Sequence, residues 1–176
     1  MSHRIVVRAA ETGDVDGIYA LLRPYAQNQI ILQRSKDDLF QHLQEFIVAE
    51  YDGILVGTAA LHIYGSNIAE IRSLVVKPSH QGKRIGHLLV EGCEKLALQL
   101  HVAQVFALTY VDRFFTNMGY DVVAKESLPH KIWTVCVHCK KFADCDEIAV
   151  QKRLSDAPIK PMEVMPILNV TVKSQA

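Results

Sequence analysis

The sequence predicts a single α/β domain of the α+β type, in which helices flank a mixed, mostly antiparallel sheet. Residues 68–76 (IAEIRSLVV) form a nearly continuous apolar run rich in β-branched side chains, which is typical of a buried central strand. Apolar residues then recur every three or four positions, which indicates a helix packed on one face: Ile85, Leu88, Leu89, Cys93, Leu96 and Leu100. Asp52-Gly53 joins two further apolar runs and is a strong hairpin signal.

The elements before the central strand follow from local patterns. Residues 3–8 read as a first strand, and residues 12–16 supply capping groups for an amphipathic helix that we expect to end near Pro24. Ser35 can cap a second helix, whose inner face carries Leu39, Leu43 and Phe46. Residues 46–50 and 54–62 are the two hairpin strands, and residues 65–67 turn into the central strand.

The remaining elements complete the predicted domain, residues 1–154. Residues 103–110 read as a strand, residues 112–118 as a short helix ended by Gly119, residues 120–124 as a sixth strand and residues 147–154 as a seventh. Residues 155–176 form a tail with three prolines. Within it, residues 167–172 either add an edge strand or dock on a partner subunit, as in a homodimer.

Composition excludes several classes of protein. A chain of 176 residues with 49% hydrophobic content can bury a full core. The formal net charge is zero, so we expect neither a nucleic-acid surface nor a polybasic membrane patch. No apolar run approaches the ~20 residues that span a bilayer, and the N-terminus lacks the apolar core of a signal peptide. We therefore expect a cytoplasmic protein.

A basic, glycine-containing loop links the central strand to the long helix. Its candidate anion-binding residues are Gln81, Gly82, Lys83, Arg84, Gly86 and His87. The start of a helix presents unpaired backbone N–H groups and the positive end of the helix dipole, which suits a phosphate. Taken alone, such a loop is a weak signal, and an ordinary turn explains it more simply.

This stretch resembles motif A of the GNAT N-acetyltransferases, whose loop reads Gln/Arg-x-x-Gly-x-Gly/Ala and holds the pyrophosphate of acetyl-CoA. Gln81 and Gly86 match the outer positions, whereas Arg84 stands where the first glycine is usual. The order of predicted elements is also that of this family. The resemblance implies a splayed sheet and acetyl-CoA as cosubstrate, with backbone N–H groups near Leu74, Val75 and Val76 facing the thioester.

The resemblance also suggests catalytic residues. Glu70 occupies the position where several members of the family carry a general base; the alternative is a carboxylate that faces water or pairs with Arg72. Many members have a tyrosine in the short helix that donates a proton to the leaving thiolate, but here the matching pair is Phe114-Phe115. Tyr110 can replace it if its side chain points into the cleft, and is otherwise a core or surface tyrosine.

Residues 5–154 are also similar to the acetyltransferase domain of bacterial N-acetylglutamate synthases. The segments LRP (residues 22–24) and LQRS (residues 32–35) carry the more specific part of this likeness. It implies a short, single-domain enzyme of arginine biosynthesis that acetylates L-glutamate. By this likeness Arg34 binds an acidic group of the substrate, Ser73 lines the pocket, and Lys140 or Lys141 supplies a second cation.

Other interpretations of these residues and of the whole chain stay open. Arg34 can instead be an exposed residue beside a helix cap, and the two lysines can belong to a solvated loop. The acceptor can be another small amine or a protein N-terminus, and the chain can also be a non-catalytic module that binds CoA or a partner protein.

The cysteines raise the question of a metal site. Cys93 lies on the apolar face of the long helix and reads as a buried thiol. Cys136 and Cys139, with Cys145 nearby, have the spacing of one zinc knuckle, which His138 or Asp146 can complete. Structural zinc sites usually draw on two knuckles, so we expect reduced thiols and no metal, with a redox or disulfide pair as a further alternative.

Overall fold

The computed structural model describes residues 3–128 and 145–155, which form a seven-stranded sheet with the strand order β1-β2-β3-β4-β5-β7-β6. The strands are β1 (Ile5–Ala9), β2 (Phe46–Tyr51), β3 (Ile54–Ile63), β4 (Ile68–Val76), β5 (Gln104–Thr109), β6 (Asp121–Val123) and β7 (Ile148–Arg153). The helices are α1 (Val15–Gln27), α2 (Lys36–Gln41), α3 (Ile85–Gln99) and α4 (Asp112–Thr116). Among the described strands only β4 and β5 pair in parallel, so the predicted mixed, mostly antiparallel sheet is confirmed.

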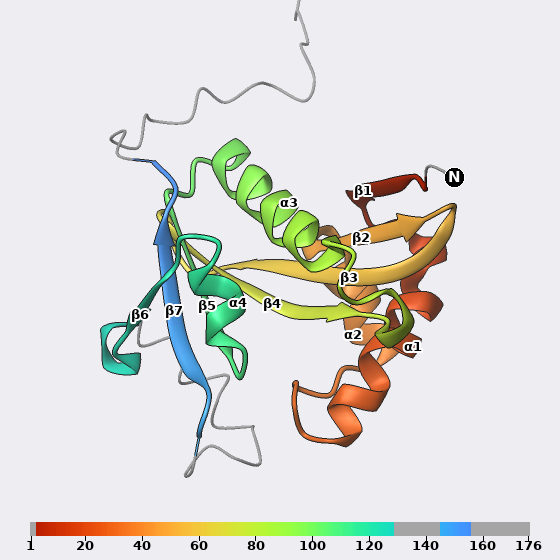
Figure 1. Ribbon diagram of the computed structural model, residues 1–176, viewed down its shortest axis with the longest axis horizontal. Helices are drawn as coiled ribbons and strands as arrows, with labels where there is room; N and C mark the ends of the chain where they lie inside the picture. The colour runs from red at the N-terminus through yellow and green to blue at the C-terminus, as the bar shows by residue number, and fades with distance from the viewer. Residues whose placement is uncertain (1–2, 129–144, 156–176) are drawn as a thin grey trace, which may run out of the picture.

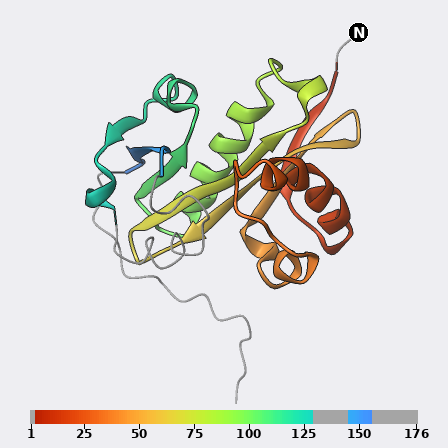
Figure 2. The same cartoon turned by 90° about the horizontal axis from the view of Figure 1, so that it is seen from below.

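The helices cover both faces of the sheet. Helix α3 lies on one face, and α1 and α2 lie on the other (Figures 1 and 2). Leu89 and Val90 of α3 are fully buried in a core that includes Val105 of β5. Ile18 of α1 and Leu39 of α2 are fully buried in a second core on the opposite face. The sheet is thus buried on both faces along β2, β3 and β4.

Two local predictions hold in detail. Asp52 and Gly53 both have positive φ angles, 51° and 80°, as a two-residue type I′ hairpin requires. Ser35 caps α2, because its hydroxyl accepts a hydrogen bond of 3.1 Å from the Asp38 amide.

Helix α1 does not end near Pro24 as predicted but continues to Gln27. Proline removes one intrahelical hydrogen bond, yet its fixed φ angle matches a helix, so the chain can continue through it. Beyond it, the Asn28 amide donates to the Pro24 carbonyl at 3.2 Å.

The apolar faces of two other helices also differ from prediction. Helix α2 ends at Gln41, so Leu43 lies in a following 3₁₀ turn and Phe46 begins β2. Leu100 lies just beyond α3 and is 46% exposed, while Ala97, which the pattern omitted, is fully buried. Ala97 can be buried there because its side chain is small enough to fit where α3 packs closely against the core.

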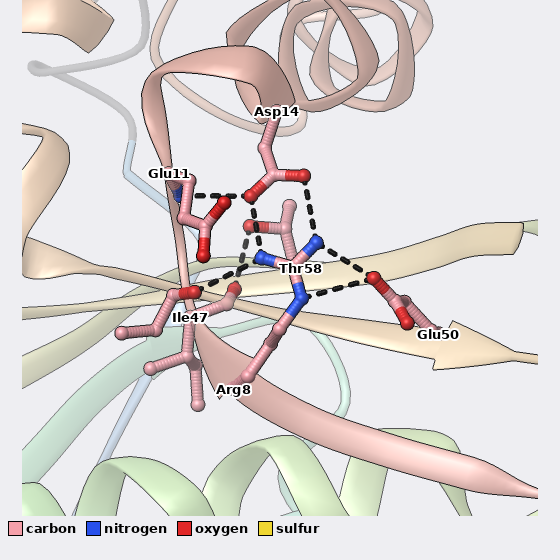
Figure 3. A network of polar contacts seen from close by, with 7 residues as sticks. Arg8, Glu11, Asp14, Ile47, Glu50 and Thr58 are labelled. Atoms are coloured by element: carbon pink, nitrogen blue, oxygen red, sulfur yellow. Dashed lines mark hydrogen bonds and ion pairs between the residues drawn. The ribbon is translucent and has the colours of Figure 1, made fainter. Parts of the chain in front are cut away.

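A polar network ties the first strand to the start of α1 and to β2 (Figure 3). The Arg8 guanidinium donates to the Asp14 carboxylate at 2.7 and 2.9 Å and to Glu50 at 2.6 and 2.9 Å. The hydrogen bond from Arg8 holds the pKa of the Asp14 carboxyl below its usual range. Nearby, the buried Thr58 hydroxyl donates to the Ile47 carbonyl at 3.0 Å.

The helices in the described part of the chain are all too short or too polar to cross a bilayer.

Candidate active site

The central strand separates from its parallel neighbour soon after the two begin to pair. Strands β4 and β5 share only three registered pairs, the last of which joins Glu70 to Phe106. On its other edge β5 pairs with β7 along its whole length, and β7 runs steeply relative to β4 in Figure 1. The β5-facing backbone groups of residues 71–76 therefore have no strand partner among the described residues.

A bulge in β4 accompanies the separation. Thr58 pairs with Val75 and Ala60 pairs with Arg72, so β4 has one residue more than β3 in this interval. Ser73 lies inside the bulge and has a φ angle of +54°. The bulge exchanges the faces that successive side chains occupy, so that Leu74 packs with the α3 core and Val75 with the α1 core.

A cavity of about 270 Å³ opens between the separated strands. Its lining includes six of the predicted site residues, Ser73, Leu74, Val75, Val76, Gln81 and Tyr110. It also includes Phe115 and Glu147. Glu70 and Arg34 are not part of this lining, although Ile71 and Arg72, which follow Glu70 along β4, are.

The loop before α3 has the backbone of an anion site. Gly82 and Arg84 have φ angles of 77° and 62°, so Arg84 adopts the left-handed conformation that glycine usually supplies. Arg84 is the N-cap of α3, and the first amide groups of a helix have no intrahelical partner. The Gln81 side chain donates to the Val76 carbonyl at 3.2 Å and thereby ties the loop to the end of β4.

The other loop residues lie around the same helix end. Residues 81–84 are exposed, whereas Gly86 and His87 are partly buried. The Lys83 ammonium lies 4.3 Å from the centre of the Tyr51 ring, and the His87 ring contacts Phe114 edge-on. A side chain at Gly86 would meet the Phe114 ring at 3.4 Å. Open donors, positive charge and little side-chain bulk fit a diphosphate at this end of the cavity.

Glu70 is a partly buried carboxylate on the α1/α2 side of the sheet. It lies opposite His62 of β3, and the Tyr64 hydroxyl donates to its carboxylate at 3.1 Å. Burial raises the pKa of Glu70, while the positive charge of Arg72 acts in the opposite direction. Arg72 itself forms its ion pair with Glu45, at 2.9 Å, and not with Glu70.

Arg34 is mostly buried, with a side chain only 11% exposed. Its guanidinium donates to Asp38 at 2.8 Å and lies 5.5 Å from the centre of the Phe46 ring. Burial and the nearby charge of Arg72 both lower the pKa of Arg34. The interpretation of Arg34 as an exposed residue beside a cap is therefore wrong.

The side of the cavity opposite β4 carries Tyr110 and Glu147. Tyr110 is 38% exposed; burial and a hydrogen bond with Asp146 raise the pKa of its hydroxyl. Burial and the charge of Glu70 raise the pKa of Glu147, a cavity residue that sequence reasoning did not single out. Glu147 precedes the last strand without any motif around it, so no sequence signal marked it.

Several predicted residues lie outside the described part of the chain: Lys140, Lys141, Cys136, His138, Cys139 and the tail from residue 156. Burial raises the pKa of the Cys93 thiol to about 12, which fits the predicted buried, unreactive thiol. Across residues 3–128 and 145–155, no three His, Cys, Asp or Glu side chains are grouped as metal ligands would be.

Comparisons with known proteins give the family. The model of the acetyltransferase (GNAT) family matches residues 15–120. An uncharacterised N-acetyltransferase of Chlorobaculum tepidum is 41% identical over 84% of this chain and 96% of its own length. An amino-acid acetyltransferase of Mycobacterium tuberculosis is 34% identical over 90% of this chain and 88% of its own.

A solved structure shows the same fold with the cofactor in place. The N-acetylglutamate synthase of Neisseria gonorrhoeae, complexed with coenzyme A and N-acetyl-glutamate, superimposes with a TM-score of 0.78 at 27% identity. The match covers 88% of this chain and 36% of that one. The chain therefore belongs to the acetyltransferase (GNAT) family and is an acetyl-CoA-dependent N-acetyltransferase.

Proposed function

We propose that this enzyme transfers the acetyl group of acetyl-CoA directly to the α-amine of L-glutamate, in a ternary complex, and so contributes to arginine biosynthesis. The observation that carries the proposal is the burial of Arg34 on the same side of the sheet as Glu70. A buried guanidinium with a single ion pair is costly unless an anion completes it, and glutamate brings two carboxylates. The names of the relatives at about a third identity support an amino-acid acceptor.

The separated strands offer a place for each part of acetyl-CoA. Residues 81–87 would hold its diphosphate through backbone donors and positive charge. The unpaired edge of β4 near Leu74 and Val76 would stabilise the negative charge that develops on the thioester oxygen.

Glu70 would remove a proton from the ammonium group of the acceptor, so that the neutral amine attacks the thioester carbon. Its raised pKa brings it closer to neutral pH, where a general base is most effective. Tyr110 remains the candidate acid for the leaving thiolate, because this residue lines the same cavity. A thiolate can also leave without a dedicated acid, since a free thiol has a pKa of roughly 8.5.

Thiol release from acetyl-CoA, measured with and without L-glutamate, tests this proposal. Glutamate should accelerate release in the wild type. Arg34→Ala should raise the KM for glutamate by at least ~30-fold, or about 2 kcal/mol of lost charge-assisted bonding, while acetyl-CoA binding barely changes. Arg34→Lys should recover only part of this loss, because an ammonium lacks the planar fork of arginine. Normal glutamate acetylation by Arg34→Ala would exclude Arg34 from substrate binding.

A further inference from the structure

Arg72 is a second mostly buried cation near the proposed base, and one of its buried donors has no partner among the described residues. Its side chain is 15% exposed and makes one hydrogen bond, from Nη2 to Glu45 at 2.9 Å. Its Nε atom is buried without any partner in the described part of the chain. A guanidinium has five N–H donors, and a buried donor left unpaired destabilises the protein because it has lost its hydrogen bonds to water.

Two such arginines are close enough to repel each other. The charge of Arg72 lowers the pKa of Arg34, and each guanidinium is held by one carboxylate through one nitrogen. Glu45, the partner of Arg72, also binds the His62 ring at 2.9 Å. The two guanidiniums therefore lie close together, and the buried Nε of Arg72 is a donor that an anionic ligand could satisfy.

The position of Arg72 along β4 suggests which anion it meets. Residues two apart in a strand point to the same face and lie roughly 6.6 Å apart, so Arg72 stands next to Glu70. Arg72 also has the largest charge effect on the pKa of Glu70, larger than that of Arg34. An α-amino acid carries its amine and its α-carboxylate on the same carbon, which matches a base and a cation side by side.

We propose that Arg72 binds the α-carboxylate of the amino-acid acceptor, while Arg34, which arrives from the connection between α1 and α2, binds the side-chain carboxylate. This assignment rests on the proposed function, because it requires a dicarboxylic amino acid. Arg72 keeps Glu45 through Nη2 and offers its other nitrogens to the substrate. The acceptor amine then lies beside Glu70.

Three acceptor substrates, L-glutamate, L-isoglutamine and L-glutamine, distinguish the proposed roles of the two arginines. L-Isoglutamine replaces only the α-carboxylate of glutamate by an amide, and L-glutamine replaces only the side-chain carboxylate. Wild-type kcat/KM should favour glutamate over either amide by at least ~30-fold, which corresponds to about 2 kcal/mol per charged contact. Arg72 also lowers the pKa of Glu70, so the variants are compared at a pH well above that pKa. There Arg72→Gln should lower kcat/KM for glutamate by a similar factor but change that for isoglutamine by less than ~3-fold.

Arg34→Gln is the matched control, because it should abolish discrimination against glutamine and preserve discrimination against isoglutamine. Glu45→Gln keeps Arg72 but removes its ion-pair partner, so the preference for glutamate over isoglutamine should survive. The KM for acetyl-CoA should stay unchanged in all variants. If Arg72→Gln does not fold, Arg72→Lys replaces it and should lose discrimination against isoglutamine in part.

The outcomes separate this inference from the proposed function. An equal loss with glutamate and isoglutamine in Arg72→Gln, or no loss at all, would make Arg72 a purely structural partner of Glu45 and leave glutamate as the substrate. A wild type that does not acetylate glutamate would contradict the proposed function itself, and the assignment of Arg72 with it.

Discussion

Glu70 shows how the surroundings of one residue shift its pKa in the direction that its proposed role as a base requires. Burial raises the pKa of its carboxyl, while the Tyr64 hydroxyl and the Arg72 charge limit the rise and fix the side chain in place. The carboxylate form that can accept a proton therefore becomes populated at a higher pH than for an exposed glutamate. Activity that depends on this form should fall as the pH drops through the raised pKa.

Replacing Glu70 by glutamine tests this role. Glu70→Gln keeps the shape of the side chain but cannot accept a proton, so turnover at neutral pH should fall roughly 100-fold or more. Acetyl-CoA binding should stay intact. The loss should shrink at high pH, where more of the free amine is already deprotonated. A pH–rate profile of both proteins measures this, and an unchanged rate at neutral pH would exclude Glu70 as the base.

At the scale of single residues, the sequence predicted which residues belong to the candidate site better than it predicted which side chains they contact. Glu70 and Arg34 were identified because they occupy positions at which related acetyltransferases carry functional residues. Arg72 appeared only as a possible partner of Glu70, because nothing in IAEIRSLVV shows that it reaches across β3 to Glu45. Such a pairing depends on strand register and on the bulge that follows, and both arise only in the folded sheet.

Among the elements, the loop before α3 has a left-handed residue that its sequence does not predict. Arg84 stands where the family usually has glycine, yet its backbone is left-handed. The open amides of the first turn of α3 are therefore available as in a glycine-containing loop.

A negative charge introduced at the start of α3 should weaken cofactor binding without preventing folding. Gly86→Asp should weaken acetyl-CoA binding severely, because the new carboxylate competes for the donors that the diphosphate needs. The new carboxylate should not destabilise α3, since an acidic side chain in the first turn interacts favourably with the helix dipole. Titration calorimetry measures the affinity.

Two control variants at Gly86 isolate the charge. Gly86→Asn has nearly the same size without charge, and Gly86→Ala adds only a methyl group at van der Waals distance from Phe114. Both should retain much more affinity than Gly86→Asp. Equal affinity of Gly86→Asp and wild type would rule out this loop as the diphosphate site.

The elements with strong local signals were predictable, and those shaped by tertiary contacts were not. The Asp52-Gly53 turn and the Ser35 cap depend on a few adjacent residues, and both are present. The continuation of α1 through Pro24 and the bulge at Ser73 depend on packing against other elements. The bulge matters most, because it sets which face of the sheet Leu74 and Val75 occupy beside the cavity.

For the molecule as a whole, the half that is covered by helices on both faces forms one wall of the candidate site. Strands β1 to β4, covered on both faces by helices, position Glu70, Arg72 and the unpaired edge of β4 (Figure 2). The Arg8 network fastens the outer strand and the start of α1 to this half (Figure 3). It lies away from the cavity, so its loss should affect stability more than chemistry.

Removing the guanidinium tests the network through its pH dependence. Arg8→Met should lower the free energy of unfolding by about 1–2 kcal/mol at neutral pH, because three partly buried charges lose their contacts. The lowered pKa of Asp14 contributes stability that is fully present above its ordinary value of 3.8 and is lost as the pH falls through the lower folded value.

Wild type and Arg8→Met should therefore converge in stability toward low pH. Urea unfolding at several pH values measures the difference. A gap that stays constant as Asp14 is protonated would mean that Arg8 acts through packing and not through its ion pairs.

The central claim is that the site selects a dicarboxylic amino acid as acceptor. One competition experiment tests it directly: wild-type enzyme receives limiting acetyl-CoA and an equimolar mixture of L-glutamate, L-glutamine, L-isoglutamine and an uncharged small amine, and mass spectrometry identifies the acetylated products. The buried arginines predict N-acetyl-L-glutamate as the dominant product. If the acetylated uncharged amine dominates instead, the glutamate assignment is wrong and only the general N-acetyltransferase activity remains.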